Sequence, residues 1–273
     1  MYPVLFSFGP FALQTISIFL LIAFFVSGFV FWKRGRAEYY SEDQLFDGFL
    51  LSGIVGYLIG RIGYTIIHFN SATIWQWLNP IAQPGVIEVL AVFAAGLYIY
   101  RFAIQNKWDG FEILDLWSMS ATAAIILLNI GAFFSGSGVG YTTSLPWGVR
   151  FPGLIDPAHP VQLYTALWFI LLYWYLSWAE NRYRTFSWYR GSKKAAQTGF
   201  LISIFTIFSA LGTFVFSYFQ PVSTSMFGIN VDQIWSVLLF IAGCILLYTR
   251  SGRVVPLTRE WLKQRRRLEK LRR

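Results

Sequence analysis

The sequence contains few charged residues, one cysteine and two histidines, and each scarcity excludes a class of protein. Charged residues make up 13% of the 273 positions, against about 25% in a typical soluble domain. Cys244 has no second cysteine to pair with in the chain, so a disulfide scaffold is excluded. The histidines His68 and His159, with one distant cysteine, make no plausible structural zinc site. A glycine-rich nucleotide-binding loop followed by lysine is also missing, and we expect no cofactor.

Apolar residues are abundant instead. Hydrophobic residues make up 56% of the chain and aromatic residues 20%, which excludes disorder. A membrane-spanning helix needs about 20 mostly apolar residues. Seven stretches qualify: 11–32, 46–67, 84–103, 114–134, 160–179, 197–219 and 232–249. We therefore expect an all-α polytopic membrane protein with seven transmembrane helices in one domain, residues 1–250, followed by a basic tail, residues 251–273.

The ends of the expected spans carry further signals. Tryptophans such as Trp108, Trp117 and Trp178 fall at or near them, as is typical of the membrane interface. No basic residue precedes the first stretch, which is also longer than the apolar region of a cleavable signal peptide. The last stretch contains no lysine, so a retinal Schiff base is unsupported.

The positions of Lys and Arg predict the orientation in the membrane. All but two of the 22 lie in loops on one side or in the tail, and the exceptions are Arg61 and Arg150. The positive-inside rule then predicts an outside N-terminus and a cytoplasmic C-terminus. The net charge of +9 reflects this topology and requires no nucleic acid as a partner. We interpret the tail as a solvated anchor, with a basic amphipathic helix on anionic head groups as the alternative.

Two ionisable residues within the expected spans are candidates for function, because charge inside a membrane is costly. Arg61 lies in the sequence Gly60-Arg61-Ile62-Gly63-Tyr64, where small residues permit close helix packing. It either faces a polar cavity or extends to the outer interface. Glu88 either pairs with Arg61 or lies among the lipid head groups. Asp115 and Asp232 fall at span ends, where helix capping explains both.

The segment 129–164 on the expected outer side is the richest in candidate residues. A helix there gives way to glycines, whose exposed backbone N–H groups suit an anionic head group. Arg150 offers a guanidinium that matches phosphate. His159 precedes Pro160, a residue favoured at the first position of a helix. The candidates for substrate binding within this segment are Asn129, Gly131, Gly136, Gly140, Gln162 and Tyr164.

Three motifs resemble the bacterial prolipoprotein diacylglyceryl transferase family. The first motif, the eight residues from Pro3 to Pro10, is similar to the sequence that precedes the first span in that family. Gly60 to Tyr64 is similar to its second-helix motif. His159-Pro160-Val161-Gln162-Leu163-Tyr164 is similar to its His-Pro-x-Gln-Leu-Tyr-Glu motif, the most specific of the three. The order of the seven expected spans agrees as well.

The resemblance implies an enzyme of lipoprotein biosynthesis in the bacterial cytoplasmic (inner) membrane. Such an enzyme transfers the diacylglyceryl group of phosphatidylglycerol to the cysteine thiol of a lipobox in a preprolipoprotein, and glycerol phosphate leaves. The reaction needs a base or a field that yields thiolate. It also needs cations or donors for the charge that develops on the departing phosphate. The partners would be phosphatidylglycerol, the preprolipoprotein and membrane lipid, with no nucleic acid.

The charged groups of the family pattern are replaced in this sequence. In the signature Gly-Arg-x-Gly-Asn-Phe-x-Asn-Gly-Glu, the positions of the arginine, the two asparagines and the glutamate hold Asn129, Ala132, Ser135 and Ser137. The histidine of the third span is missing, Gln220 and Pro221 stand where the family has charges, and Thr165 replaces a glutamate. One hypothesis is that Arg150 supplies the lost cation.

Three functions remain open from the sequence. The first is the family reaction, with Arg61 and Arg150 for phosphate and with His159, Gln162 and Tyr164 to orient the substrates. The catalytic candidates are His159 and Arg150; the substrate-binding candidates also include Glu88. The second is a non-catalytic relative that binds phospholipid or lipoprotein peptide, and the third is an unrelated seven-helix transporter or sensor. We take the family transferase as the predicted function.

Overall fold

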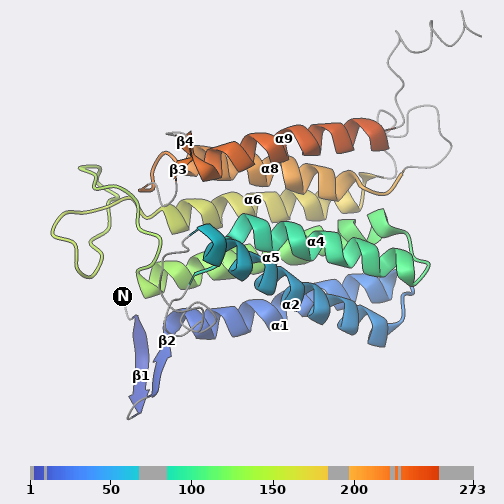
Figure 1. Ribbon diagram of the computed structural model, residues 1–273, viewed down its shortest axis with the longest axis horizontal. Helices are drawn as coiled ribbons and strands as arrows, with labels where there is room; N and C mark the ends of the chain where they lie inside the picture. Colours follow the sequence, from blue (N-terminus) through green and yellow to red (C-terminus); the bar gives the residue numbers. More distant parts are fainter. Residues whose placement is uncertain are drawn as a thin grey trace, which may run out of the picture.

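The computed structural model describes residues 3–8, 11–67, 85–183, 197–221, 225–226 and 229–251. Within this part the chain forms a bundle of seven helices (Figure 1). The helices are α1 (Thr15–Ala37), α2 (Glu42–Ile67), α4 (Glu88–Gln105), α5 (Gly110–Ser135), α6 (Val161–Glu180), α8 (Phe200–Phe216) and α9 (Val231–Arg250). The all-α prediction is thus confirmed. His68 and the basic tail from residue 252 onward lie outside the described residues.

Five of these helices, α1, α2, α4, α5 and α9, are long and apolar enough to cross a membrane. In α8 the apolar run is 17 residues long, just below the length of those five. The 20 residues of α6 include several Trp and Tyr side chains, which hydropathy scales rate below aliphatic residues. The protein is a multi-pass membrane protein.

α5 lies at the centre of the bundle, where it contacts α1, α4, α6 and α8. Small residues allow this close packing. A Cβ atom on Gly131 of α5 would collide with Phe19 of α1. Similarly, a Cβ atom on Gly56 of α2 would lie 2.7 Å from the Ala91 carbonyl oxygen of α4. These glycines therefore set the spacing of their helix pairs.

Two short hairpins accompany the helices. β1 (Val4–Phe8) pairs antiparallel with β2 (Phe11–Gln14), and β3 (Ser225–Met226) pairs with β4 (Ile229–Asn230). The Thr15 N–H donates to the Pro3 carbonyl at 3.0 Å. The prediction that the first helix begins at residue 11 was wrong, because the backbone of residues 11–14 is engaged in the hairpin and the helix begins at Thr15.

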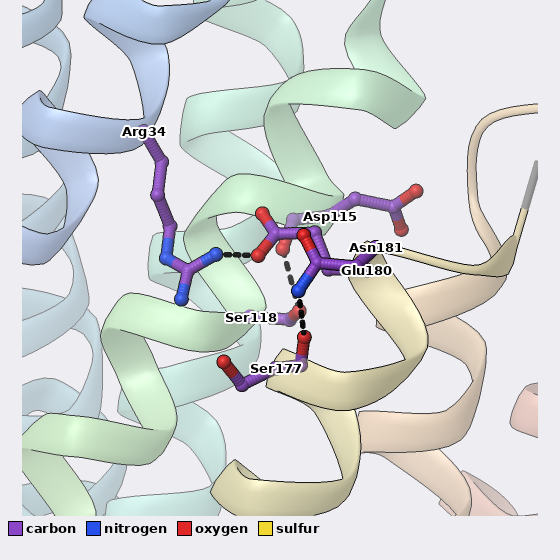
Figure 2. Close-up of polar contacts among 6 residues, drawn as sticks. All are labelled: Arg34, Asp115, Ser118, Ser177, Glu180 and Asn181. Atoms are coloured by element: carbon purple, nitrogen blue, oxygen red, sulfur yellow. Dashed lines mark hydrogen bonds and ion pairs between the residues drawn. The ribbon is translucent and has the colours of Figure 1, made fainter.

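The helices alternate in direction, so their ends gather at two ends of the bundle. We call the end that carries residues 136–160 the histidine end, and the opposite end the charged end. At the charged end, Arg34 of α1 forms an ion pair with Glu180 of α6 (Figure 2). The Ser118 hydroxyl donates to the Asp115 carbonyl at 2.7 Å, and the Asn181 amide donates to the Ser177 carbonyl at 3.1 Å (Figure 2).

The carboxylate of Asp115 caps a helix, although not its own. α5 begins at Gly110, and Asp109 accepts hydrogen bonds at its N-terminus. The buried Asp115 carboxylate instead accepts from the Gly199 N–H at 2.7 Å and from the Ile202 N–H at 2.8 Å, at the start of α8. The capping interpretation is correct in kind, but the capped helix is a neighbour.

Candidate functional site

At the histidine end, the chain leaves α5 through glycines that turn it back over the bundle. Gly136 caps α5 with a φ of 74°, and Gly138 has a φ of 70°. Both values lie in the left-handed region, which glycine adopts without a steric penalty. The Gly140 N–H donates to the His159 carbonyl at 3.1 Å, and the His159 N–H donates to the Tyr141 carbonyl at 3.0 Å. The glycine segment and the start of α6 are therefore joined by backbone hydrogen bonds.

These bonds place the histidine motif in one cluster. The half-buried His159 ring has its Nδ1 atom 3.3 Å from the Tyr164 hydroxyl oxygen. The Phe219 ring lies edge-on to His159, with centroids 5.2 Å apart. Gln162 is 2% exposed, and its amide donates to the Ser137 carbonyl. The structure thus brings together three predicted site residues, His159, Gln162 and Tyr164. α6 begins one residue later than predicted, at Val161, with Pro160 in the capping position.

The glycine segment does not present a free row of N–H groups. The N–H groups of Gly136 and Ser137 donate to carbonyls in the last turn of α5, and those of Gly140 and Tyr141 donate to the His159 and Phe219 carbonyls. These four N–H groups are occupied, which argues against the predicted cradle for an anion. Gly140 serves close packing instead, since a Cβ atom there would lie 2.6 Å from the Phe219 carbonyl oxygen.

Beside this cluster lies a cavity of about 550 Å³ between α4, α5, α6, α8 and α9. Its walls are mainly apolar, and Phe169, Phe205 and Leu246 contribute to them. We call it the five-helix cavity. Phe216 lines it and also packs against the Tyr164 ring, with centroids 6.5 Å apart. The cavity and the His159 cluster are therefore neighbouring parts of one candidate site.

Most polar groups of the five-helix cavity lie in its middle or toward the histidine end. These are Glu88, Asn129, Thr165, Ser209, Thr213, Ser217, Gln220 and Asp232, whereas Tyr100 and Thr206 line the cavity nearer the charged end. Two of them, Glu88 and Asn129, were predicted as binding residues. The Gln220 amide donates to the Gly138 carbonyl at 3.3 Å, which links the cavity to the glycine segment. Among the described residues that line the cavity, none is Lys, Arg or His.

Asp232, Gln220 and Ser209 were not predicted as site residues. The prediction that Asp232 caps a helix was wrong, because the cap of α9 is Asn230, whose side chain accepts from the Asp232 N–H. The Asp232 carboxylate is thereby left to line the cavity. These residues come from α8, α9 and the loop between them. Gln220 stands where the family pattern has a charged residue, whereas no motif marks Ser209 or Asp232. The signal of Ser209 and Asp232 is only that polar residues interrupt apolar helices.

The remaining predicted residues lie apart from the cluster. Arg61 is buried in α2, and its guanidinium donates to the Gly85 carbonyl at 2.9 Å and lies over the Tyr64 ring. Glu88 lines the cavity, and we find no ion pair between it and Arg61 within the described residues. Arg150 is exposed in the loop between α5 and α6, and we find no ion pair of its side chain within the described residues. Gly131 lies in the α1–α5 contact.

Comparison with known proteins gives a consistent result. The family model of prolipoprotein diacylglyceryl transferase matches residues 3–249. A phosphatidylglycerol–prolipoprotein diacylglyceryl transferase of Clostridium tetani is 27% identical over 253 residues, covering 80% of this chain and 97% of the relative. The protein of the same name from Campylobacter lari is 26% identical, covering 78% of this chain and 82% of the relative. The one from a Wolbachia species is 32% identical, covering 60% of this chain and 64% of the relative.

Proposed function

Because the chain belongs to the prolipoprotein diacylglyceryl transferase family, we propose that it transfers a diacylglyceryl group from a phospholipid to a lipobox cysteine. The relatives are named for phosphatidylglycerol as donor and prolipoprotein as acceptor, so these are the substrates to test. By the positive-inside rule, we place the histidine end on the outer face of the bacterial cytoplasmic membrane.

The observation that carries this proposal is the position of His159 beside the polar end of an apolar cavity. Diacylglyceryl chains need an apolar space that opens among the helices, and the five-helix cavity supplies one. The thiol of the acceptor needs a proton acceptor at the head-group end of that space. His159 is the one histidine among the described residues. It lies near that end of the cavity, and its Nδ1 atom is 3.3 Å from the Tyr164 hydroxyl oxygen.

In the proposed reaction, the lipobox thiol gives its proton to the His159 imidazole. The thiolate then forms a C–S bond to the glycerol carbon that bears the phosphate, as the C–O bond to that phosphate breaks. Glycerol phosphate leaves with the electron pair of that bond and takes up a proton in turn. Tyr164 would hold the imidazole through Nδ1, and Gln162 would hold the glycine segment through Ser137.

Arg150 is the proposed source of positive charge for the leaving phosphate. It lies in the loop between α5 and α6, which also contains the Val149–Ala158 bridge next to His159. An exposed guanidinium at this end can bind a phosphate in the forked geometry that arginine favours. Arg61 contributes to the fold at Gly85, and we propose no contact between it and the substrate.

A second candidate function follows from the charge of the cavity. Glu88 and Asp232 line it, and none of its described lining residues is a cation. Phosphoryl leaving groups need positive charge or oriented donors. This observation favours a relative that binds the lipid without transferring it, which is the alternative to the transferase.

The deciding experiment measures transfer of radiolabelled diacylglyceryl from phosphatidylglycerol to a lipobox peptide by the purified full chain. We expect labelled peptide with the cysteine peptide and none with a Cys→Ser peptide. General base catalysis contributes about 100- to 10,000-fold, so His159→Ala should lower the rate by at least about 100-fold. Binding of the lipid without any transfer would overturn the transferase in favour of the second candidate.

Arg150 needs its own comparison. Arg150→Ala should slow transfer by about 10- to 100-fold, the effect of losing one charge-assisted contact to phosphate. Arg101→Ala is the matched control, because Arg101 is an exposed arginine of α4 near the charged end. Equal rates for the two variants would remove Arg150 from the proposed mechanism.

A further inference from the structure

We propose that Ser209 and Thr213 of α8 form a binding site for the two ester carbonyls of a diacylglycerol lipid. The five-helix cavity would thereby select ester-linked over ether-linked glycerolipids. The inference rests on the proposed function, which places the diacylglyceryl group of the donor in this cavity, and it adds the side chains that recognise the acyl linkages.

The hydroxyl groups in and just after α8 are of two kinds. The side chains of Ser203, Thr206 and Ser217 donate hydrogen bonds of 2.5–2.7 Å to carbonyls three or four residues earlier in the chain, the usual way for a helix to satisfy a hydroxyl internally. The buried Ser209 Oγ atom has no hydrogen-bond partner within the described residues. We find no hydrogen bond of the Thr213 hydroxyl within this part of the chain either. These two hydroxyls are therefore available to a ligand.

The spacing of the two hydroxyls suits two neighbouring carbonyls. Ser209 and Thr213 both line the five-helix cavity. Residues four positions apart in a helix lie on one face, with Cβ atoms about 5–6 Å apart. The two ester groups of a diacylglycerol are attached to adjacent glycerol carbons, so their carbonyl oxygens are also close neighbours. Each serine or threonine hydroxyl has one proton to donate, which gives one donor for each carbonyl.

The depth of the two residues matches the position of the esters in the proposed reaction. Phe216 lines the cavity and packs against Tyr164 of the His159 cluster. Along α8, Thr213 lies about 4.5 Å and Ser209 about 10 Å from Phe216, at 1.5 Å per residue. A glycerol carbon that reacts beside His159 would thus have its esters next to Thr213 and Ser209. The mainly apolar lining beyond them would receive the acyl chains.

The cost of an unpaired hydroxyl indicates that Ser209 has a partner in the working protein. A buried donor without an acceptor is costly, and most such groups are paired in folded proteins. Other hydroxyls of the lining, those of Thr165, Thr206 and Ser217, already donate within their own helices. An ester carbonyl brings an acceptor and no donor, so it satisfies Ser209 without leaving another group unpaired.

Retention of defined lipids by the purified full chain tests this proposal. The chain is loaded in detergent with equal amounts of a phosphatidylglycerol with two ester-linked chains and its analogue with two ether-linked chains of the same length. The analogue keeps the head group and the chains and lacks only the two carbonyls. The lipid that remains bound is measured by native mass spectrometry. Two neutral hydrogen bonds correspond to about a 5- to 100-fold preference, and we expect a preference in this range for the ester lipid.

The hydroxyls are tested by Ser209→Ala and Thr213→Val, which remove the donor and change the side-chain volume little. Each should reduce the preference, and the double variant should abolish it. Ser203→Ala is the matched control, because the Ser203 hydroxyl donates to the Gly199 carbonyl and Ser203 is not among the lining residues. It should leave the preference unchanged. If the double variant does not fold, Ser209→Ala compared with Ser203→Ala still decides.

Equal retention of the two lipids by the unaltered chain would overturn the inference. A water molecule that satisfied Ser209 in place of the lipid would give this result. A preference that remains unchanged in Ser209→Ala, or that falls equally in Ser203→Ala, would overturn it as well.

Failure of the proposed function would be a different result. The bond that breaks in the proposed reaction joins the glycerol carbon to the phosphate oxygen, and both lipids contain it. Equal transfer from the two lipids at low donor concentration would retain the transferase and refute the ester site. Selective retention of the ester lipid with no transfer from either lipid would support the ester site and refute the transferase.

Discussion

Replacing Asp115 by alanine should destabilise the bundle by separating α8 from α5. The buried Asp115 carboxylate accepts from the Gly199 N–H at 2.7 Å and the Ile202 N–H at 2.8 Å. Asp115→Ala leaves both donors without this acceptor at a buried site. Losing a helix cap costs about 0.5–2 kcal/mol, and each unsatisfied buried donor costs about 1–3 kcal/mol. Because these terms overlap, we expect a loss of about 2–4 kcal/mol.

The assay is thermal unfolding of the purified chain in detergent, followed by tryptophan fluorescence. A loss of this size corresponds to a decrease of about 5–15 °C in Tm for a chain of this length, by the scaling for soluble domains. Asp115→Asn keeps one acceptor oxygen and should lower Tm by less. Asp47→Ala, at an exposed position of α2, is the matched control and should change stability by less than about 0.5 kcal/mol. Equal Tm values for Asp115→Ala and Asp47→Ala would refute the reasoning.

Two further predictions concern the histidine end and the loop between α1 and α2. Gly140→Ala should lower the free energy of unfolding by about 1–3 kcal/mol through overpacking, and it should reduce transfer. Gly53→Ala is the control and should be neutral or stabilising, because the space around its Cβ position is open. Equal Tm values for the two variants would contradict this. Burial, and then the 2.6 Å hydrogen bond to Glu112, raise the pKa of the Tyr40 hydroxyl above its usual value near 10. The contribution of the protonated Tyr40 hydroxyl to stability is therefore complete below about pH 10 and lost at higher pH. Tyr40→Phe should flatten the decrease in Tm at alkaline pH, whereas Tyr39→Phe, at an exposed position, should leave that decrease unchanged.

The helices could be predicted from the sequence because hydrophobic run length is a local property. The predicted span 114–134 corresponds to α5, Gly110–Ser135. The start of α1 was missed because Phe11–Gln14 is as apolar as the helix that follows, and only pairing with β1 distinguishes it. Trp117 was assigned to a span end, yet it is buried in the core against Phe205, because α5 begins before the apolar run does.

The candidate site was predictable only where it is local in sequence. His159, Gln162 and Tyr164 lie within six positions at the start of one helix, so their proximity follows from helical geometry. Asp232 and Ser209 reach the cavity from α9 and α8, and no pattern joins them to His159 before the helices pack. The pairing of distant helices is the information that a single sequence does not contain.

Several of the predicted site residues serve mainly the packing of the bundle. Arg61 contacts the Gly85 carbonyl, Gly131 lies against Phe19, and a side chain at Gly140 would meet the Phe219 carbonyl. These contacts are needed whether or not the protein transfers lipid. Their presence therefore establishes the fold and does not discriminate between a transferase and a lipid-binding relative. The discrimination depends on groups that face the ligand, and for that reason His159→Ala in the transfer assay is more informative than any substitution at Arg61, Gly131 or Gly140.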